Sequence, residues 1–457
     1  MDSPAVTNQE NFRQRVRQSF TGAAANLVLR AYDCAGERFG TGLAERVRVA
    51  DILLRQRADH IVVTAALLAS LRRHGCIEAS EIRSLFGEVP AGLVEKVFSE
   101  KVLRTDTEVH RKEDVRLFLE SISDDIRTLI LQIGLRLAEL EKIAGQDGND
   151  HRNIARETLE LYVPLTGRMG MGGLRTQLED VCFRILEPAI YEELAQNVEP
   201  IRAEDNVCLE LLKVGVKRLL RRNGVKGTVY GRAKGLYSIH RKMNRLGCSL
   251  EEIMDKIGLR IIVSSVEKCY AVLGLLHTHF RPVPGTFDDY IGLPKENGYQ
   301  SLHTCVYPVP DISHKPVEFQ IRTEAMHWEA EFGVAAHWLY KSGEETKVSS
   351  DRQLQWLRGL LSHHERSASH AEFIEHLHRQ VFDDRLVVFD AAGQPIRLPA
   401  GTTVRNFAGQ FSRSNGLESI VRVNGVVRPS DYPLRDGDTV ELIVEETCVD
   451  GGDGIIA

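Results

Sequence analysis

The sequence lacks the features of membrane and exported proteins. No stretch approaches the roughly 18 unbroken apolar residues of a membrane-spanning helix. The amino end, Met1-Asp2-Ser3-Pro4, is polar and acidic, and no apolar signal-peptide segment follows it. The eight cysteines are scattered and form no Cys-x-x-Cys pair, which argues against a disulfide framework and against a zinc module. These absences predict a cytoplasmic protein without membrane contact.

A phosphate-binding loop of the Gly-x-x-x-x-Gly-Lys-Ser/Thr type is also absent. With 58 Lys and Arg against 64 Asp and Glu, the net charge of -6 disfavours indiscriminate nucleic-acid binding. The charge is uneven, because the stretch from Lys213 to Arg245 is rich in cations and contains no carboxylate. A solvated basic helix face is one explanation. The interleaved glycines and the later carboxylates at Asp255, Asp288 and Asp289 favour a second, a metal-assisted nucleotide site.

Hydrophobic periodicity divides the chain into regions of different structure. The length of 457 residues and the hydrophobic content of 43% predict two to four packed domains. Apolar residues recur at three- and four-residue spacing from about 10 to 200, which predicts helices, and a mixed pattern follows from about 205. The mixed region is expected to contain a helix ending at Arg222, strands at Thr228–Tyr230, Leu259–Val263, Leu302–Tyr307 and Val317–Ile321, and helices at Leu236–Arg245 and Val266–Phe280.

The last hundred residues predict a connector and a small unit. Residues 345–383 form a polar, His-rich helical pattern, and residues 384–445 are rich in short strands with a hairpin turn at Asn424-Gly425. The five histidines between His363 and His378 suggest either a metal site or a solvated connector, and the second is favoured.

The segment from Gly231 to Gly235 places Arg232 and Lys234 where glycines allow close backbone approach. Ser238 and Lys242 follow four residues apart, on one face of the expected helix. These side chains predict a line of polyphosphate-binding groups.

The strand around residue 318 alternates strictly between apolar and polar residues. The inward residues are Val317, Phe319 and Ile321, and the outward residues are Glu318, Gln320 and Arg322. An outward Glu on a strand is more often solvated than catalytic. Together with Asp255, which precedes the Leu259–Val263 strand, Glu318 could nevertheless hold one Mg²⁺.

The loop from Lys295 to His303 combines a cation, an amide, an aromatic ring and an imidazole. Tyr299 could stack on a nucleobase while Asn297 reads its edge. Alternatively, the Tyr ring only packs on the domain edge.

Several long motifs resemble, in order, the synthetase domain of the RelA/SpoT alarmone enzymes. They are Gly231-Arg-Ala-Lys-Gly-Leu-Tyr-Ser-Ile, Asp255 with Arg260-Ile-Ile-Val, Pro294-Lys-Glu-Asn-Gly-Tyr-Gln-Ser-Leu-His-Thr, Val317-Glu-Phe-Gln-Ile-Arg-Thr and Gly333-Val-Ala-Ala-His-Trp. The N-terminal half resembles the family's HD hydrolase region through Leu161-Tyr-Val-Pro-Leu and Leu178-Glu-Asp-Val-Cys-Phe, and residues 384–445 resemble its TGS domain.

The resemblance implies a multidomain α+β protein. We expect an all-α pseudo-HD domain over 1–195, a mixed α/β nucleotidyltransferase-like synthetase domain over 200–345, a helical connector over 346–383, a β-grasp TGS-like domain over 384–445 and a tail over 446–457.

The family reaction transfers the β,γ-pyrophosphate of ATP to the 3′-hydroxyl of GTP or GDP. The resemblance implies that ATP is held by Arg232, Lys234, Ser238 and Lys242, and that GTP or GDP is held by Lys295, Asn297, Tyr299, His303 and Gln320. It further implies that Asp255 binds Mg²⁺ and that Glu318 binds Mg²⁺ or acts as the base, so both are expected to be catalytic.

The sequence also departs from the family in several places. Ala69-Ser70 stands where hydrolases of the family have their His-Asp pair, and Leu135 stands at a later metal-binding Asp, so we expect no alarmone hydrolysis. The loop Thr286-Phe287-Asp288-Asp289 has the acidic character of synthesis-only members. The segment from Gly231 to Gly235 lacks the usual Pro and His of its motif.

The TGS-like unit departs from the family as well. The stretch from Phe411 to Ile420 lacks the histidines of members that read tRNA on the ribosome, which weakens the expectation of ribosome or tRNA contact.

Three functions stay open from the sequence. The first is a synthesis-only alarmone synthetase, the second is a regulatory partner-binding protein, and the third is pyrophosphoryl transfer to another acceptor, such as a different purine nucleotide or a tRNA end. Stacking on Tyr299 does not separate the acceptors, because every purine has a π-face. A homo-oligomer also stays open.

Overall fold

The structure is a computed structural model that divides into two compact units, residues 1–377 and 378–457. It describes residues 4–39, 43, 47–99, 108–146, 148–247, 249–250, 257–295, 297–307, 316–334, 345–382, 385–399, 401–411, 419–435 and 437–444. Across these described residues, no helix is both long enough and apolar enough to cross a membrane.

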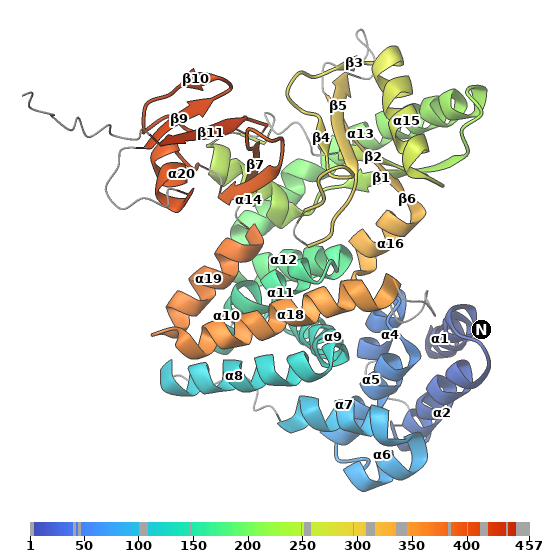
Figure 1. Cartoon of the computed structure of the whole chain (residues 1–457). Coiled ribbons are helices and arrows are strands. Elements are labelled where there is room, and N and C mark those ends of the chain that lie inside the picture. The colour runs from blue at the N-terminus through green and yellow to red at the C-terminus, as the bar shows by residue number, and fades with distance from the viewer. Residues whose placement is uncertain are drawn as a thin grey trace, which may run out of the picture. The chain divides into compact units, whose positions relative to one another are not determined.

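The first unit begins with a helical half, residues 4–186 (Figure 1). Its helices are α1 (Pro4–Ser19), α2 (Gly22–Phe39), α4 (Arg48–Arg55), α5 (His60–Arg73), α6 (Ala79–Phe86), α7 (Glu88–Ser99), α8 (Glu108–Asp124), α9 (Ile126–Ile143), α10 (Asn149–Glu157), the π-helical turn η2 (Thr158–Tyr162), α11 (Val163–Arg168) and α12 (Gly172–Leu186). The predicted helical region is therefore confirmed.

Helix α5 lies at the centre of this half. It begins where the Asp59 carboxylate accepts a hydrogen bond from the Val62 backbone N–H at 2.8 Å. It is buried on nearly all sides, as expected for a helix that packs against α2, α4, α7 and α9. Ala69, which takes the place of a metal-binding residue in the resemblance, is only 2% exposed.

The α/β half, residues 188–334, is built on one mixed sheet. The long helix α13 (Pro188–Arg222) leads into β1 (Gly227–Ala233), α14 (Leu236–Leu246), β2 (Ile257–Val263), α15 (Val266–His279), β3 (Arg281–Pro282), β4 (Asp288–Asp289), β5 (Leu302–Tyr307), β6 (Val317–Thr323) and α16 (Glu324–Phe332). The strand order is β1-β2-β6-β5-β3, with β4 also pairing with β5. Strands β2 and β6 are parallel, and the other pairs are antiparallel.

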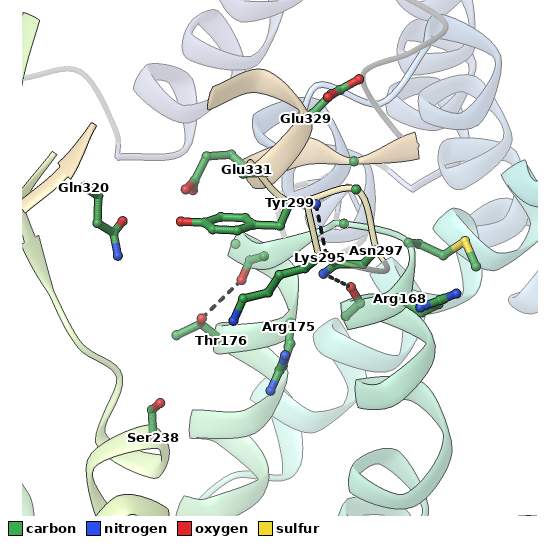
Figure 2. Close-up of a pocket in the computed structure, with 18 of the residues that line it drawn as sticks. Arg168, Arg175, Thr176, Ser238, Lys295, Asn297, Tyr299, Gln320, Glu329 and Glu331 are labelled. Carbon is green, nitrogen blue, oxygen red and sulfur yellow. Dashed lines mark hydrogen bonds between the residues drawn. The ribbon is translucent and has the colours of Figure 1, made fainter. Parts of the chain in front are cut away.

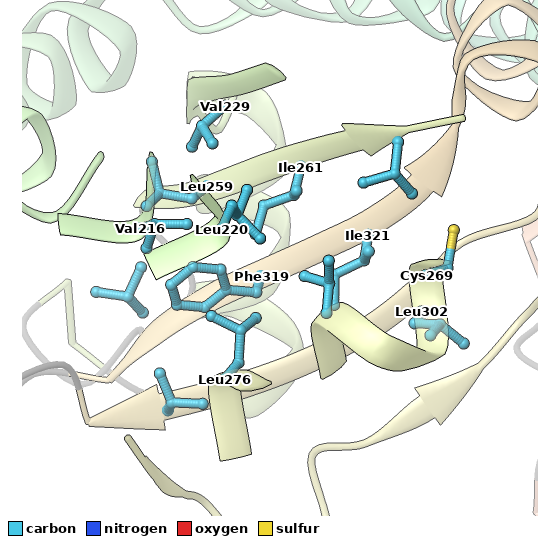
Figure 3. Close-up of a cluster of buried hydrophobic side chains, with 14 of the residues drawn as sticks. Val216, Leu220, Val229, Leu259, Ile261, Cys269, Leu276, Leu302, Phe319 and Ile321 are labelled. Carbon is cyan, nitrogen blue, oxygen red and sulfur yellow. The ribbon is translucent and has the colours of Figure 1, made fainter. Parts of the chain in front are cut away.

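One face of the sheet packs under α13 and α15, as Figure 3 shows. The side chains labelled there are Val216, Leu220, Val229, Leu259, Ile261, Cys269, Leu276, Leu302, Phe319 and Ile321. The predicted inward phase of Val317, Phe319 and Ile321 is confirmed, since all three belong to this core.

The opposite face of β6 differs from the ordinary half-exposed pattern. Gln320 is 3% exposed and Arg322 is 1% exposed, although both alternate with core residues. The reason is that a second layer covers this face, since α16 packs on β6 and on α12 of the helical half. Polar side chains that the sequence would place in solvent are therefore enclosed.

Backbone contact between two glycine-containing segments joins the halves. A Cβ on Gly172 would lie 2.7 Å from the Ala330 carbonyl oxygen, and a Cβ on Gly333 would lie 2.0 Å from the Met169 carbonyl oxygen. Gly333 also has a positive φ of 49°. The Val334 N–H donates to the same Met169 oxygen at 3.1 Å. Only glycine permits this approach.

Helices α18 (Glu345–Arg366) and α19 (His370–Phe382) lie in the region predicted to be a helical connector, and α18 packs along α8. The favoured interpretation of its histidines as solvated is wrong for His364, which is 1% exposed and meets the Phe373 ring edge-on at 4.6 Å. The His363 and His376 rings stack at 3.5 Å. The described residues contain no group of three or more His, Cys, Asp or Glu that could hold a metal ion.

The described residues of the second unit include two small sheets and the helix α20 between them. Strands β7 (Arg385–Phe389) and β8 (Pro395–Pro399) form a hairpin, α20 (Val404–Phe411) follows, and β9 (Ser419–Val423) lies between β10 (Val426–Val427) and β11 (Val440–Val444). The predicted hairpin at Asn424-Gly425 is confirmed, with φ of 52° and 78° at the two residues.

Candidate functional site

A cavity of about 810 Å³ opens between the helical half and the polar face of the sheet. Its wall contains Gly167, Arg168, Met169, Gly170, Gly172, Gly173, Arg175, Thr176, Gln177 and Glu179 from the helical half, Lys234, Gly235, Ser238, Arg260, Lys295, Asn297, Gly298, Tyr299, His303, Glu318, Gln320, Arg322, Glu329, Ala330, Glu331 and Gly333 from the α/β half, and Gln353 and Trp356 from α18. Figure 2 shows many of these side chains. The volume lies in the range typical of small-molecule sites.

The charge of the wall favours an anionic ligand. Its described residues include the cations Arg168, Arg175, Lys234, Arg260, Lys295 and Arg322 and the carboxylates Glu179, Glu318, Glu329 and Glu331. Six cations thus face four carboxylates, in a protein whose total charge is -6. A concave, partly enclosed surface with this local excess concentrates anions.

Strand register brings His303, Glu318 and Gln320 together. His303 on β5 lies directly opposite Gln320 on β6, and Glu318 is two residues from Gln320 on the same face. His303 Nδ1 and Glu318 Oε1 are 3.2 Å apart, and Gln320 Nε2 donates to Glu318 Oε2 at 3.2 Å. Both carboxylate oxygens are therefore held in place.

The Tyr299 hydroxyl lies 2.8 Å from His303 Nε2. In the tautomer with its proton on Nδ1, the ring nitrogen nearer Glu318, His303 accepts the Tyr299 hydroxyl proton at Nε2. Tyr299, His303 and Glu318 thus form one continuous chain of polar contacts.

Gln320 leaves one polar atom unsatisfied. Its Oε1 is buried and has no hydrogen-bond partner, although the residue lines the cavity. An unpaired buried acceptor costs roughly 1–3 kcal/mol. A ligand that donates a hydrogen bond at this point would recover that energy.

An ion cluster supports the Tyr299 ring. Arg322 donates from Nη2 to Glu331 at 3.0 Å and lies 2.8 Å from His327 Nδ1, and Arg260 pairs with the same Glu331 oxygen at 2.7 Å. Burial raises the pKa of Glu331, but Arg260 and Arg322 outweigh burial, so the pKa is below its ordinary value. The Arg322 guanidinium carbon lies 5.9 Å from the centre of the Tyr299 ring.

His327 remains neutral beside this cluster. Burial lowers its pKa to about 4, and the charges of Arg322 and Arg260 act in the same direction. The neutral ring can therefore accept at Nδ1 from the Arg322 guanidinium.

The turn between β1 and α14 carries Lys234 and Ser238. A Cβ on Gly235 would lie 2.9 Å from Thr176 Cγ2 and 3.1 Å from the Asp180 carboxylate. Asp180 accepts from the Tyr237 backbone N–H at 2.9 Å, which places a carboxylate of α12 at the start of α14. The helical half therefore fixes the position of the predicted ATP-binding turn.

The structure brings most of the predicted site residues together. Lys234, Ser238, Lys295, Asn297, Tyr299, His303, Glu318 and Gln320 all line the cavity. Lys242 shares the helix face of Ser238 but lies one turn farther along α14, outside the cavity wall. Asp255 and the side chain of Arg232 lie outside the described residues.

The sequence did not reveal the wall supplied by the helical half. Arg175, Glu179 and the glycines near residue 170 line the cavity, and Asn297 Nδ2 donates to the Gly167 carbonyl oxygen at 3.2 Å. The run Met169-Gly-Met-Gly-Gly was the available signal, since clustered glycines often mark close backbone approach.

Three family models match the chain. The HD domain matches residues 24–172, the region found in RelA / SpoT proteins matches residues 231–345, and the TGS domain matches residues 387–444. The chain is also 34% identical over 411 residues to the GTP pyrophosphokinase of Escherichia coli strain K12. The chain belongs to the RelA/SpoT family. The predicted fold class, with an HD-type helical domain, an α/β synthetase domain and a TGS domain, is confirmed.

Relatives within the RelA/SpoT family carry different names. The guanosine-3′,5′-bis(diphosphate) 3′-pyrophosphohydrolase of Aquifex aeolicus is 36% identical over 430 residues, which are 92% of this chain and 61% of that protein. The E. coli pyrophosphokinase match covers 88% of this chain and 55% of that protein. The chain therefore spans little more than half the length of these relatives, and family membership alone does not separate synthesis from hydrolysis.

Among solved structures, the small alarmone synthetase 1 of Bacillus subtilis bound to its product pppGpp is 28% identical to the RelA/SpoT chain described here. The match covers 37% of this chain and 96% of that one, with a TM-score of 0.28.

Proposed function

We propose that the protein transfers the β,γ-pyrophosphate of ATP to the 3′-hydroxyl of GTP or GDP. The observation that carries this proposal is the chain Tyr299–His303–Glu318 in a cavity with excess positive charge. It combines an aromatic ring that can stack on a guanine with an oriented carboxylate that can take a proton. Phosphoryl-type transfer needs little more than such positioning, charge neutralisation and a base.

In the proposed mechanism, Glu318 accepts the proton of the acceptor's 3′-hydroxyl. The 3′-oxygen forms a bond to the β-phosphorus of ATP, and the bond from this phosphorus to the oxygen bridging it to the α-phosphate breaks, so AMP leaves with that oxygen. His303 and Gln320 hold the carboxylate oxygens of Glu318, which keeps the base oriented before substrate binds.

The donor is assigned to the turn between β1 and α14. Lys234 and Ser238 line the cavity there, and the proposal retains Arg232 and Lys242 as further ATP-binding residues. The acceptor is assigned to Tyr299 for stacking, with Lys295, Asn297, His303 and Gln320 around its base and phosphates. The unsatisfied Gln320 Oε1 supports a hydrogen-bond donor on the acceptor nucleotide.

The site fits Mg²⁺ in its donor chemistry. The ion usually takes one or two carboxylates and completes its shell with phosphate oxygens and water. Asp255, which precedes β2 by two positions in the sequence, would hold it, and binding Mg²⁺ is the alternative role of Glu318 to that of the base. When bound, Mg²⁺ would neutralise charge on the transferred phosphates.

We propose that the protein synthesises without hydrolysing. Ala69, Ser70 and Leu135 occupy the positions of the metal-binding residues in the resemblance, and none has the carboxylate or imidazole that the metal site requires. The acidic loop agrees with this proposal. Its Asp289 accepts from the Tyr270 hydroxyl at 2.8 Å. Its Asp288 lies opposite His303 in the backbone register of β4 and β5.

A survey of acceptors tests the proposal. The protein is incubated with ATP, Mg²⁺ and, in turn, GDP, GTP, ADP, ITP and deacylated tRNA, and the products are read by mass spectrometry. We expect 3′-pyrophosphorylated guanosine nucleotides together with AMP. Transfer to a different acceptor in preference to GDP and GTP would replace the proposed substrate, and absence of AMP with every acceptor would refute the transfer itself.

A further inference from the structure

Three charged residues of the cavity wall, Arg168, Arg175 and Glu179, come from the helical half, residues 4–186, which is called the HD-type half below. Arg175 lies in the first turn of α12 and lines the cavity together with Lys295 and Ser238 of the α/β half (Figure 2). Lys234 lines the same cavity. The Arg175 side chain is 25% exposed, so it is neither fully solvated nor enclosed in the helical core.

A buried carboxylate orients Arg175. Glu179, one helical turn along α12, is 5% exposed and accepts from Arg175 Nε at 2.9 Å. A guanidinium has five N–H donors in a rigid plane and can engage a carboxylate on one edge and phosphate oxygens on another. Glu179 thus fixes the direction of the guanidinium plane through its Nε edge.

Gly167 links Arg175 to the acceptor loop, residues 295–299. A Cβ on Gly167 would lie 3.2 Å from Arg175 Cδ and 3.3 Å from its Nη1, so the arginine passes directly over this glycine. The Gly167 carbonyl oxygen accepts from Asn297 Nδ2 at 3.2 Å. One residue therefore sets the position of Arg175 and of the loop that carries Lys295 and Tyr299.

We propose that Arg175 binds the 5′-phosphates of the acceptor nucleotide together with Lys295. This inference rests on the proposed function, because that function assigns the loop to GTP or GDP. The HD-type half then supplies part of the substrate site of the synthetase domain. Arg175 passes over Gly167, whose carbonyl oxygen accepts from Asn297 of the acceptor loop, so we assign Arg175 to the acceptor and not to ATP.

The competing explanation is that Arg175 only stabilises α12 through its pair with Glu179. The two explanations differ in which Michaelis constant changes. A structural role lowers the unfolding temperature and affects both substrates alike, whereas a phosphate contact raises the acceptor KM alone.

The test compares Arg175→Gln and Arg175→Lys with the wild type, with Arg184→Gln as a matched control. Arg184 is exposed in the last turn of the same helix and lies outside the cavity wall. We expect Arg175→Gln to raise the KM for GDP and GTP roughly tenfold or more, as for loss of a charged hydrogen bond, with the KM for ATP within about twofold. Arg175→Lys should recover part of the effect, and Arg184→Gln should match the wild type.

An unchanged acceptor KM in Arg175→Gln, or an equal rise in both constants, would overturn the inference. Where Arg175→Gln unfolds, Gly167→Ala gives a second route, since its methyl group would displace Arg175, and it should raise the acceptor KM in the same direction. If the wild type forms no product, the proposed function fails separately. Calorimetric GDP binding to the wild type and Arg175→Gln still tests the contact, and equal affinities would refute it.

Discussion

The HD-type half and the synthetase domain both bury charged groups, but they use them differently. In the helical half, Arg136 is 5% exposed, pairs with Glu157 at 2.8 Å and lies 4.7 Å from the Tyr162 ring centre. In the synthetase domain, Glu318 and Arg322 face a cavity whose cations outnumber its carboxylates. A buried charged side chain alone therefore does not indicate a ligand-binding site. An excess of cations over carboxylates around a cavity does indicate one.

The surroundings of position 135 show the same difference between the two regions. Leu135 stands where the resemblance has a metal-binding Asp, and its neighbour Arg136 faces a second carboxylate, Glu139, at 4.0 Å. Arg136 neutralises these carboxylates, and its removal would leave buried charge unpaired. The HD-type half thus contributes packing and one cavity wall, and the synthetase domain contributes the proposed chemistry.

The largest effect is expected from removing the proposed base. Glu318→Gln keeps the shape of the side chain but cannot take a proton, so turnover should fall by about 10²–10⁴-fold while nucleotide binding changes little. Product formation and calorimetric nucleotide binding are measured in parallel. Glu324→Gln, an exposed residue at the start of α16 and outside the cavity wall, is the control. Near-normal turnover in Glu318→Gln would remove its assigned role.

The next effect concerns the stability of the HD-type half. Arg136→Ala leaves Glu157 without its buried partner, which should lower the free energy of unfolding by about 3–5 kcal/mol. Urea unfolding gives the value, and the product assay at low temperature should still show synthesis. Arg83→Ala breaks the exposed pairs with Glu88 and Glu95 and should cost far less. Equal losses in the two variants would contradict the structural role of Arg136.

A smaller effect is expected at the stacking residue. Tyr299→Ala should raise the KM for GDP by the value of one stacked base, about 1–3 kcal/mol or roughly 5–150-fold. Tyr299→Phe retains the ring but loses the hydrogen bond to His303. It should therefore separate the effect of stacking on the nucleobase from the effect of the contact with His303 and Glu318. Steady-state kinetics with GDP and with ATP distinguish the two. A KM for GDP that is unaffected by Tyr299→Ala would show that the ring only packs.

The smallest effect is a pH dependence of stability at α18, which packs on α8 and also lines the cavity. Burial lowers the pKa of His364 from 6.5 to about 4, and the charges of Lys112, His370 and Arg116 act in the same direction. Between these values the unfolded chain takes up a proton that the folded chain does not, so stability falls as the pH drops from about 6.5 toward 4.

His364→Leu should reduce this loss of stability, with urea unfolding at pH 7.5 and pH 5.5 as the measurement. His279→Leu replaces an exposed histidine and should leave the pH dependence unchanged. An identical slope in the wild type and His364→Leu would contradict the assignment.

The sequence predicted what depends on local periodicity. The phase of β6, the bounds of β5 and the hairpin at Asn424 follow from alternation and turn chemistry, and they agree with the structure. Helical spacing also placed Ser238 and Lys242 on one face, but it could not show that the cavity ends before Lys242.

Long-range contacts set the limit of that prediction. Gly167 and Asn297 are 130 residues apart, and no local pattern indicates that they share a hydrogen bond. The burial of Gln320 and Arg322 has the same cause, since α16, which also packs on α12, covers a strand face that alternation alone would assign to solvent.

The most direct test of the comparison measures both reactions on one preparation. Mass spectrometry follows guanosine nucleotides in two incubations of the same protein, one with ATP, GDP and Mg²⁺, and one with ppGpp and Mn²⁺. We expect ppGpp and AMP in the first incubation and unchanged ppGpp in the second. Release of GDP and pyrophosphate from ppGpp in the second incubation, or absence of AMP in the first, would contradict it.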